Sequence, residues 1–105
     1  DVVIGNIADN ALIKGSFGKL EIKNVSNNFK HLDMVLDNTD AIVVLPGSAF
    51  NFYCNTTNSK VNFPDQLRID VTKKYAGLLA KGYHKQKNSN KNITLTAIYS
   101  EVVIR

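Results

Sequence analysis

The chain has 105 residues, of which 44% are hydrophobic and 21% are charged, and its formal net charge at pH 7 is +4. This balance excludes an intrinsically disordered chain, and the longest clean aliphatic run, residues 41–45, is far shorter than the ~20 residues that a membrane-spanning helix needs. We therefore expect residues 1–105 to form a single soluble domain.

Alternating apolar and polar residues predict strands along most of the chain. In residues 17–23, Leu20 and Ile22 fall on one face and the charged residues fall on the other. The same period of two recurs in three further segments, residues 31–37, 67–72 and 92–99, where Leu32, Ile93 and Tyr99 fall on the predicted buried faces. Because helical spacing would distribute these apolar residues around a cylinder, we expect strands with one buried and one solvated face.

Shorter apolar segments predict further strands. They are residues 2–4, 11–13, 41–45, 49–54 and 101–104. The tetrapeptide at residues 37–40, Asp-Asn-Thr-Asp, favours a turn, and Pro46-Gly47 fits the central positions of a type II turn. These two turns would make residues 31–54 a meander of about three strands.

Residues 73–81 interrupt the alternation. Tyr75, Leu78 and Leu79 follow helical spacing, and Gly82 is in a position to end a helix. Gly77 lowers the helix propensity by about 1 kcal/mol relative to alanine. We expect one short helix or helical turn here, followed by a polar, lysine-rich loop.

These segments together predict an all-β domain of about seven to nine short strands. An antiparallel β-sandwich of immunoglobulin-like architecture, with the short helix or helical turn near residues 73–81, is the expected fold. A small open barrel is the alternative. The chain has no Trp and one Cys, so any likeness to true immunoglobulin domains would be limited to the architecture.

No constellation of residues in the sequence indicates catalysis. His31 and His84 are far apart in the chain, and we expect both to be solvated. Cys54 is the single cysteine, which excludes an intramolecular disulfide. It shares a strand face with Phe50 and Phe52, which predicts a small buried hydrophobic residue and not a nucleophile. We expect no catalytic residue, no metal site and no cofactor.

Basic residues concentrate in the last third of the chain. Residues 1–70 contain six basic and eight acidic side chains, whereas residues 71–105 contain seven basic and one acidic. Lysines interleaved with aromatic residues predict a contact with an anionic partner, such as nucleic acid, an acidic glycan or lipid head groups, although a solvated loop fits the same pattern. The candidate residues are Lys73, Lys74, Lys81, Tyr83, Lys85, Lys87 and Lys91.

Protein–protein assembly or surface attachment is the function that we expect, with binding of an anionic polymer as the alternative. Sandwich edge strands recruit partner strands, so the apolar segments 2–4 and 102–104 are candidates for self-association or for binding a protein partner, unless they complete the domain itself. Asn24, Asn55 and Asn92 begin Asn-x-Ser/Thr sequons, which suit a glycosylated surface protein, although roughly 1.5 sequons are expected by chance in a chain so rich in asparagine. We expect an extracytoplasmic setting, which would be periplasmic, secreted or at a particle surface.

Overall fold

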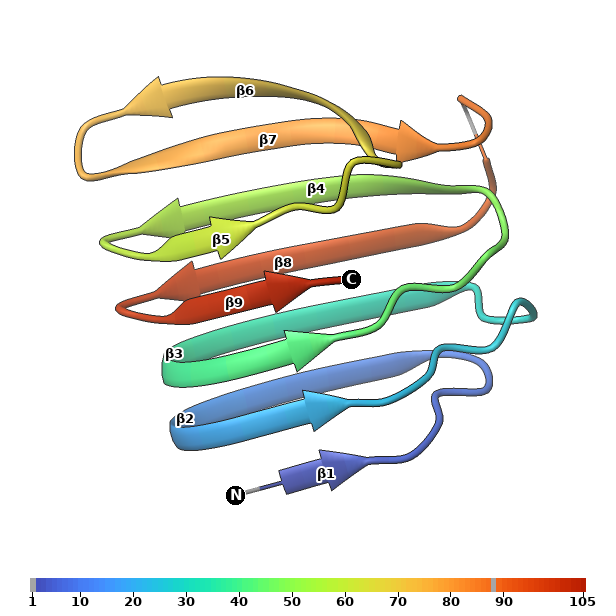
Figure 1. The fold of residues 1–105 in the computed structure, drawn as a ribbon, viewed down its shortest axis with the longest axis horizontal. Coiled ribbons are helices and arrows are strands. Elements are labelled where there is room, and N and C mark those ends of the chain that lie inside the picture. Colours follow the sequence, from blue (N-terminus) through green and yellow to red (C-terminus); the bar gives the residue numbers. More distant parts are fainter. Residues whose placement is uncertain (1, 88) are drawn as a thin grey trace.

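The computed structural model describes residues 2–87 and 89–105, which form β-strands joined by turns and loops (Figure 1). The strands are β1 (Val2–Ile4), β2 (Ala11–Ile22), β3 (His31–Val43), β4 (Phe50–Thr57), β5 (Lys60–Asn62), β6 (Arg68–Lys74), β7 (Gly77–His84), β8 (Asn92–Ile98) and β9 (Glu101–Ile104). The prediction of an all-β fold is confirmed, and the described part of the chain contains no helix.

All nine strands belong to one mixed sheet. Hydrogen-bonded neighbours follow the order β1-β2-β3-β8-β4-β7-β6, and β9 lies between β3 and β5. Only β4–β7 and β6–β7 pair antiparallel, whereas the other pairings are parallel. Antiparallel pairing is therefore wrong for most of the sheet, and the immunoglobulin-like sandwich is not confirmed. The reason is that alternation identifies the buried face of a strand but not its neighbour.

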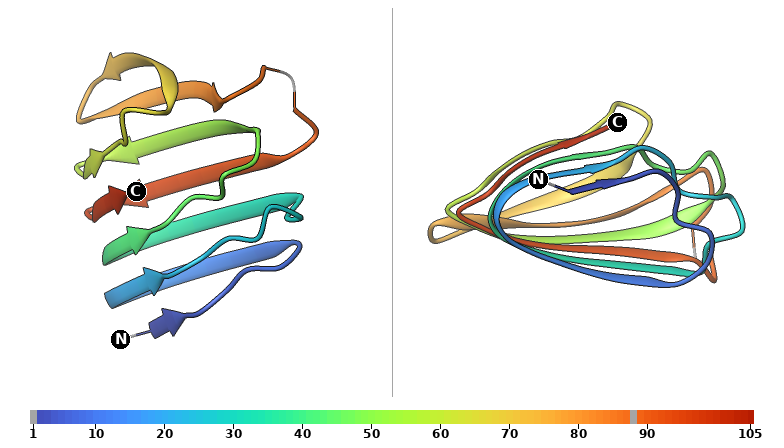
Figure 2. Two further views of the ribbon diagram at one scale, coloured as in Figure 1. Left: turned by 45° about the vertical axis from the view of Figure 1, so that its right-hand side comes forward. Right: turned by 90° about the horizontal axis from the view of Figure 1, so that it is seen from below.

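The sheet folds back on itself, so that two layers face each other (Figure 2). The first layer contains β8, β4, β7 and the first halves of β2 and β3, with β6 along its edge. The second layer contains β1, β5, β9 and the second halves of β2 and β3. The layers meet where the strands bend and separate toward the opposite end (Figure 2, right).

Residues with left-handed backbone mark the bends. They are Phe17 (φ 63°), Asn38 (φ 49°), Tyr99 (φ 47°), Asn58 (φ 47°) and Ala76 (φ 63°). Strand register aligns these residues, which we call the bend row, across neighbouring strands. A left-handed residue kinks the chain and increases its twist. Phe17, Asn38, Asn58 and Tyr99 turn the chain from the first layer toward the second, whereas Ala76 lies in the turn between β6 and β7.

The strands β8 and β9, last in the chain, lie in the middle of the sheet (Figure 1). β8 pairs with β3 on one side and β4 on the other, while β9 pairs with β3 and β5. The predicted meander over residues 31–54 is therefore wrong, because β8 separates β3 from β4. Residues 37–40 are a bend inside β3, and Pro46-Gly47 lies in a loop between the layers, where Gly47 does not have the left-handed φ that a type II turn requires.

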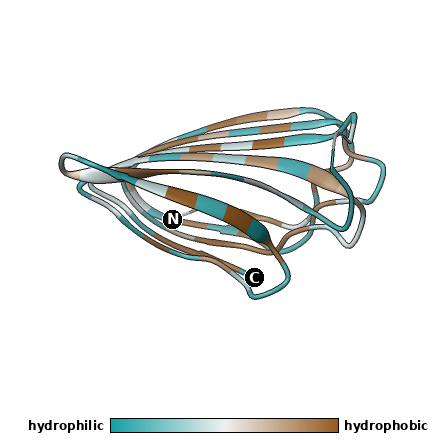
Figure 3. Ribbon diagram, turned by 90° about the horizontal axis from the view of Figure 1, so that it is seen from above, coloured by the Kyte–Doolittle hydropathy of each residue, from teal (hydrophilic) through white to brown (hydrophobic). Residues whose placement is uncertain are grey.

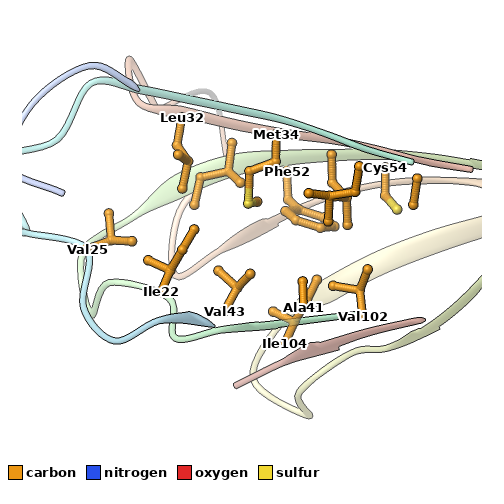
Figure 4. Packing of buried hydrophobic residues seen from close by; sticks show 14 of the residues in the cluster. Ile22, Val25, Leu32, Met34, Ala41, Val43, Phe52, Cys54, Val102 and Ile104 are labelled. Atoms are coloured by element: carbon orange, nitrogen blue, oxygen red, sulfur yellow. The ribbon is translucent and has the colours of Figure 1, made fainter. Parts of the chain in front are cut away.

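Hydrophobic side chains from both layers fill the space between them (Figure 4). Leu32 and Phe52 come from the first layer, Ile22 and Val43 from the second, and all four side chains are fully buried. Apolar and polar residues alternate along the strands (Figure 3), as the sequence predicts. Tyr99, predicted to share the buried face of β8, is instead 60% exposed because the chain bends there.

Residues 73–81 form the end of β6, a two-residue turn and the start of β7, so the predicted helix or helical turn is wrong. The helical spacing was misleading because Gly77 and Gly82 serve another purpose. A Cβ atom at Gly77 would lie 1.9 Å from the Thr56 carbonyl oxygen, and one at Gly82 would lie 1.9 Å from the Arg68 carbonyl oxygen. Glycine at these positions lets the backbones of neighbouring strands approach closely.

Candidate binding surfaces

The candidate anion-binding residues do not form one patch. Lys81 and Tyr83 on β7 and Lys87 in the following loop line a single depression on the outer face of the first layer. Lys74 lies at the end of β6, where its Nζ donates a hydrogen bond to Asn55 Oδ1 and not to a group of the depression.

The other three lysines lie elsewhere. Lys73 lines a different depression, beside the bend row. Lys85 is exposed in the loop after β7 and has a left-handed φ of 66°. Lys91 donates a hydrogen bond through Nζ to the Asn27 carbonyl oxygen, and the same atom lies 6.0 Å from the centroid of the Phe29 ring. Of the seven candidate residues, three therefore share one depression, and the other four lie outside it.

The depression lies over β4, β7 and β6 and has a volume of about 1010 Å³. Strand register arranges its side chains in two neighbouring rows. The first row consists of Asn51, Tyr83 and Arg68, and the second consists of Tyr53, Lys81 and Asp70. We call this surface, lined by these six residues and by Asp65, Gln66, Leu67, Ile69, Gly82 and Lys87, the β4–β7–β6 depression.

Charged and amide side chains border the β4–β7–β6 depression. Asp65 and Gln66, in the loop before β6, line it together with Lys87. The Lys81 Nζ lies 5.8 Å from the Tyr53 ring centroid, and the Lys87 Nζ lies 5.7 Å from that of Tyr83. Each tyrosine ring therefore has a cation within the range of a cation–π interaction.

Only part of this depression can be predicted from the sequence. The interleaving of lysines and tyrosines indicated Lys81, Tyr83 and Lys87, but Tyr53 and Arg68 were missed. Both missed residues occupy outward positions of predicted strands, which is the signal that could have found them. The sequence does not say that their strands are both neighbours of β7.

The nucleophile and base candidates lie apart from the depression. Cys54 is 3% exposed, which confirms the predicted buried thiol, and burial raises its pKa from 9.0 to about 12. His84 is half-buried, with Nδ1 3.0 Å from the Ser48 carbonyl oxygen and its ring 5.3 Å from that of Phe50, so the expected solvated position is wrong. His31 is exposed, as expected. No group of His, Cys, Asp and Glu in residues 2–87 and 89–105 could hold a metal ion.

A second surface is the open edge at the N-terminal end of the sheet. β1 pairs only with Leu20, Glu21 and Ile22 of β2. Residues 11–17 of β2 pair with β3 on one side, and no other described strand pairs with them. The exposed apolar side chains here are Val2 (55%), Val3 (61%), Leu12 (63%) and Phe17 (78%). In the other predicted edge, residues 102–104, Val102 and Val103 are instead paired with both β3 and β5, and Ile104 is paired with β3.

None of the described residues forms a helix that could cross a membrane. No protein-family model, curated protein or solved structure matches the chain. The two surfaces described above are therefore the basis on which a function is inferred.

Proposed function

We propose that the protein is a non-catalytic assembly module that binds a second copy of itself through residues 11–17 of β2. The open edge carries this proposal, because its backbone N–H and C=O groups face no strand among residues 2–87 and 89–105. Such an edge is a template to which a strand from another chain adds. Cys54, buried and protonated at neutral pH, supports a non-catalytic role.

The composition of this edge favours pairing. Lys14 is the single charged residue in residues 11–17, whereas β6, an edge at the other end of the sheet, has four charged residues among seven. Charged side chains protect an edge strand from addition, and so does shortness, as in the three-residue β5. Of the described edges, the one at residues 11–17 is therefore best suited to accept a strand.

The position of Lys14 selects the register. In a two-fold dimer, the same segment from both copies pairs antiparallel, and the contact closes on itself. A register centred on Ile13 places Leu12 opposite Lys14 of the second copy, so the two lysines are not paired with each other. The lysine stems then cover the exposed leucines. A register centred on Lys14 would place like charges directly opposite, which is destabilising.

The register gives a sharp test in the variant Leu12→Lys. Each new lysine would face Lys14 of the second copy, so the dissociation constant of the dimer should rise by roughly tenfold or more. Leu12→Glu would place opposite charges there and should weaken the dimer less. Light scattering across a concentration series up to millimolar protein measures both constants.

Leu79→Lys is the matched control, because Leu79 is also an exposed leucine but lies within β7, which is paired on both sides. This variant should leave the dimer unchanged. A wild-type protein that stays monomeric over the whole series would overturn the proposal, and so would equal weakening by Leu12→Lys and Leu79→Lys. Equal effects of Leu12→Lys and Leu12→Glu would exclude the register centred on Ile13.

A further inference from the structure

We infer that the β4–β7–β6 depression binds an oligosaccharide that contains carboxylated sugars. This inference does not depend on self-association, because the depression lies over β4, β7 and β6, whereas the open edge lies beside β1 and β2 at the other end of the sheet. Among the anionic partners that the sequence suggested, the chemistry of the lining residues separates acidic glycans from nucleic acids.

The tyrosine rings and their neighbouring cations fit an acidic sugar. Tyr53 is 42% exposed, and Tyr83 lies on the adjacent strand, opposite Asn51 and therefore two residues along from Tyr53. Aromatic rings bind the apolar C–H face of a sugar ring by stacking. Lys81 and Lys87, each with Nζ within 5.8 Å of a tyrosine centroid, provide cations beside the rings with which a sugar carboxylate would pair.

The carboxylates of the depression argue against a nucleic acid. Asp65 and Asp70 lie in the same depression as Arg68 and Lys81. Grooves for single-stranded nucleic acids follow the phosphate of each nucleotide with cations, whereas the aspartates here leave part of the depression suited to neutral groups that donate hydrogen bonds. An ionised carboxylate only accepts hydrogen bonds, so it needs a ligand that donates them. Sugar hydroxyl groups both donate and accept, so a glycan satisfies lysines and aspartates together.

Apart from the Asn51 amide nitrogen, the polar side chains of the two rows have hydrogen-bonding groups that a ligand could use. Asn51 Nδ2 donates to the Ser89 carbonyl oxygen (2.7 Å) and to Asn92 Oδ1 (3.1 Å), which fixes the amide at the edge of the depression. Among the described residues, no other polar side chain of the two rows makes a side-chain hydrogen bond. Planar amide, guanidinium and carboxylate groups at fixed strand positions give directional contacts to adjacent hydroxyls.

Calorimetric titration with a hexamer of galacturonate tests this inference, with a neutral glucose hexamer as the comparison. The acidic hexamer should bind and the neutral one should bind more weakly. Tyr53→Ala and Lys81→Gln should each raise the dissociation constant roughly tenfold or more. Circular dichroism establishes that each variant keeps the wild-type strand content.

Lys74→Gln is the matched control, because it removes the same charge from the neighbouring strand β6 at a residue that does not line the depression. It should leave the affinity for the acidic hexamer within a factor of about two. Absence of binding to the acidic hexamer would overturn the inference. Equal loss in Lys74→Gln and Lys81→Gln, or tighter binding of a thymidine oligonucleotide than of the hexamer, would also overturn it.

Discussion

Left-handed backbone is unfavourable at Phe17 and Tyr99. A non-glycine residue in this conformation costs roughly 1–2 kcal/mol, and asparagine tolerates it better than aromatic residues do. Both side chains are more than half exposed, so burial does not offset the cost. The bend row therefore contains two asparagines that tolerate left-handed backbone, Asn38 and Asn58, and two aromatic residues, Phe17 and Tyr99, that are strained by it.

Glycine at a strained position of the bend row should stabilise the fold. Phe17→Gly should raise the free energy of unfolding by about 0.5–1 kcal/mol, because relief of the left-handed strain exceeds the added entropy of the unfolded chain. Urea denaturation followed by circular dichroism measures this change. The control is Ser16→Gly at the preceding position, whose φ is not left-handed and where glycine should destabilise the fold by about 0.5 kcal/mol. Destabilisation by Phe17→Gly would contradict this account of the bend.

The burial of single residues is the feature that the sequence predicts best. Leu32, Phe52 and Ile93 were predicted to face the interior, and all three are fully buried. Alternation reports burial directly, because successive side chains in a strand point to opposite faces. Tyr99 was assigned to the wrong face because a left-handed residue resets the alternation, and an isolated tyrosine gives no sign of such a bend.

Whole elements were predicted less well, and the hairpin of β6 and β7 shows why. Tyr75, Leu78 and Leu79 satisfy helical spacing, but Gly77 and Gly82 were better explained by close strand contacts. Pairing partners could not be predicted, because strand faces alone do not define which strands are neighbours or in which direction they run. For the same reason, only the β7 side of the β4–β7–β6 depression was identified from the sequence.

The close contact at Gly82 leads to a prediction for this hairpin. In Gly82→Ala, the new methyl group would meet the Arg68 carbonyl oxygen and the Ile69 Cα atom, so β6 must move away from β7. We expect the free energy of unfolding to fall by about 1–3 kcal/mol, as for other overpacked positions. Thermal unfolding measures the loss.

Gly5→Ala, after β1, is the control for Gly82→Ala. A Cβ atom placed at Gly5 would have no other part of the protein within 4 Å, apart from its chain neighbours. Its effect should stay within about 0.5 kcal/mol. Equal stability of the two variants would show that β6 and β7 do not need the close approach.

At the scale of the molecule, the central position of β8 and β9 links all other parts of the sheet. Val102 of β9 aligns with Ala41 on one side and Val61 on the other, and it is fully buried. The strands that precede β8 in the chain thus form two groups, β1–β3 and β4–β7. The two groups are joined by β8, which pairs with β3 and β4, and by β9, which pairs with β3 and β5. Stability should therefore depend more on this late segment than on the first strand.

A buried charge in β9 should destabilise the whole sheet. Val102→Asp should lower the free energy of unfolding by about 4 kcal/mol or more, because the carboxylate would lie between two layers of apolar side chains. Val3→Asp, at a position that is 61% exposed in β1, should change it by about 0.5 kcal/mol or less. Urea titrations at low protein concentration measure both, and a similar loss in the two variants would contradict a central role for β9.

The place of β8 and β9 also sets a constraint on biosynthesis. While the ribosome is still translating residues 1–91, the nascent chain has no strand to insert between β3 and β4, so both of these strands expose unpaired edges. Native structure must wait until residues 92–104 have left the exit tunnel. During that interval the unpaired edges of β3 and β4 are sites for aggregation.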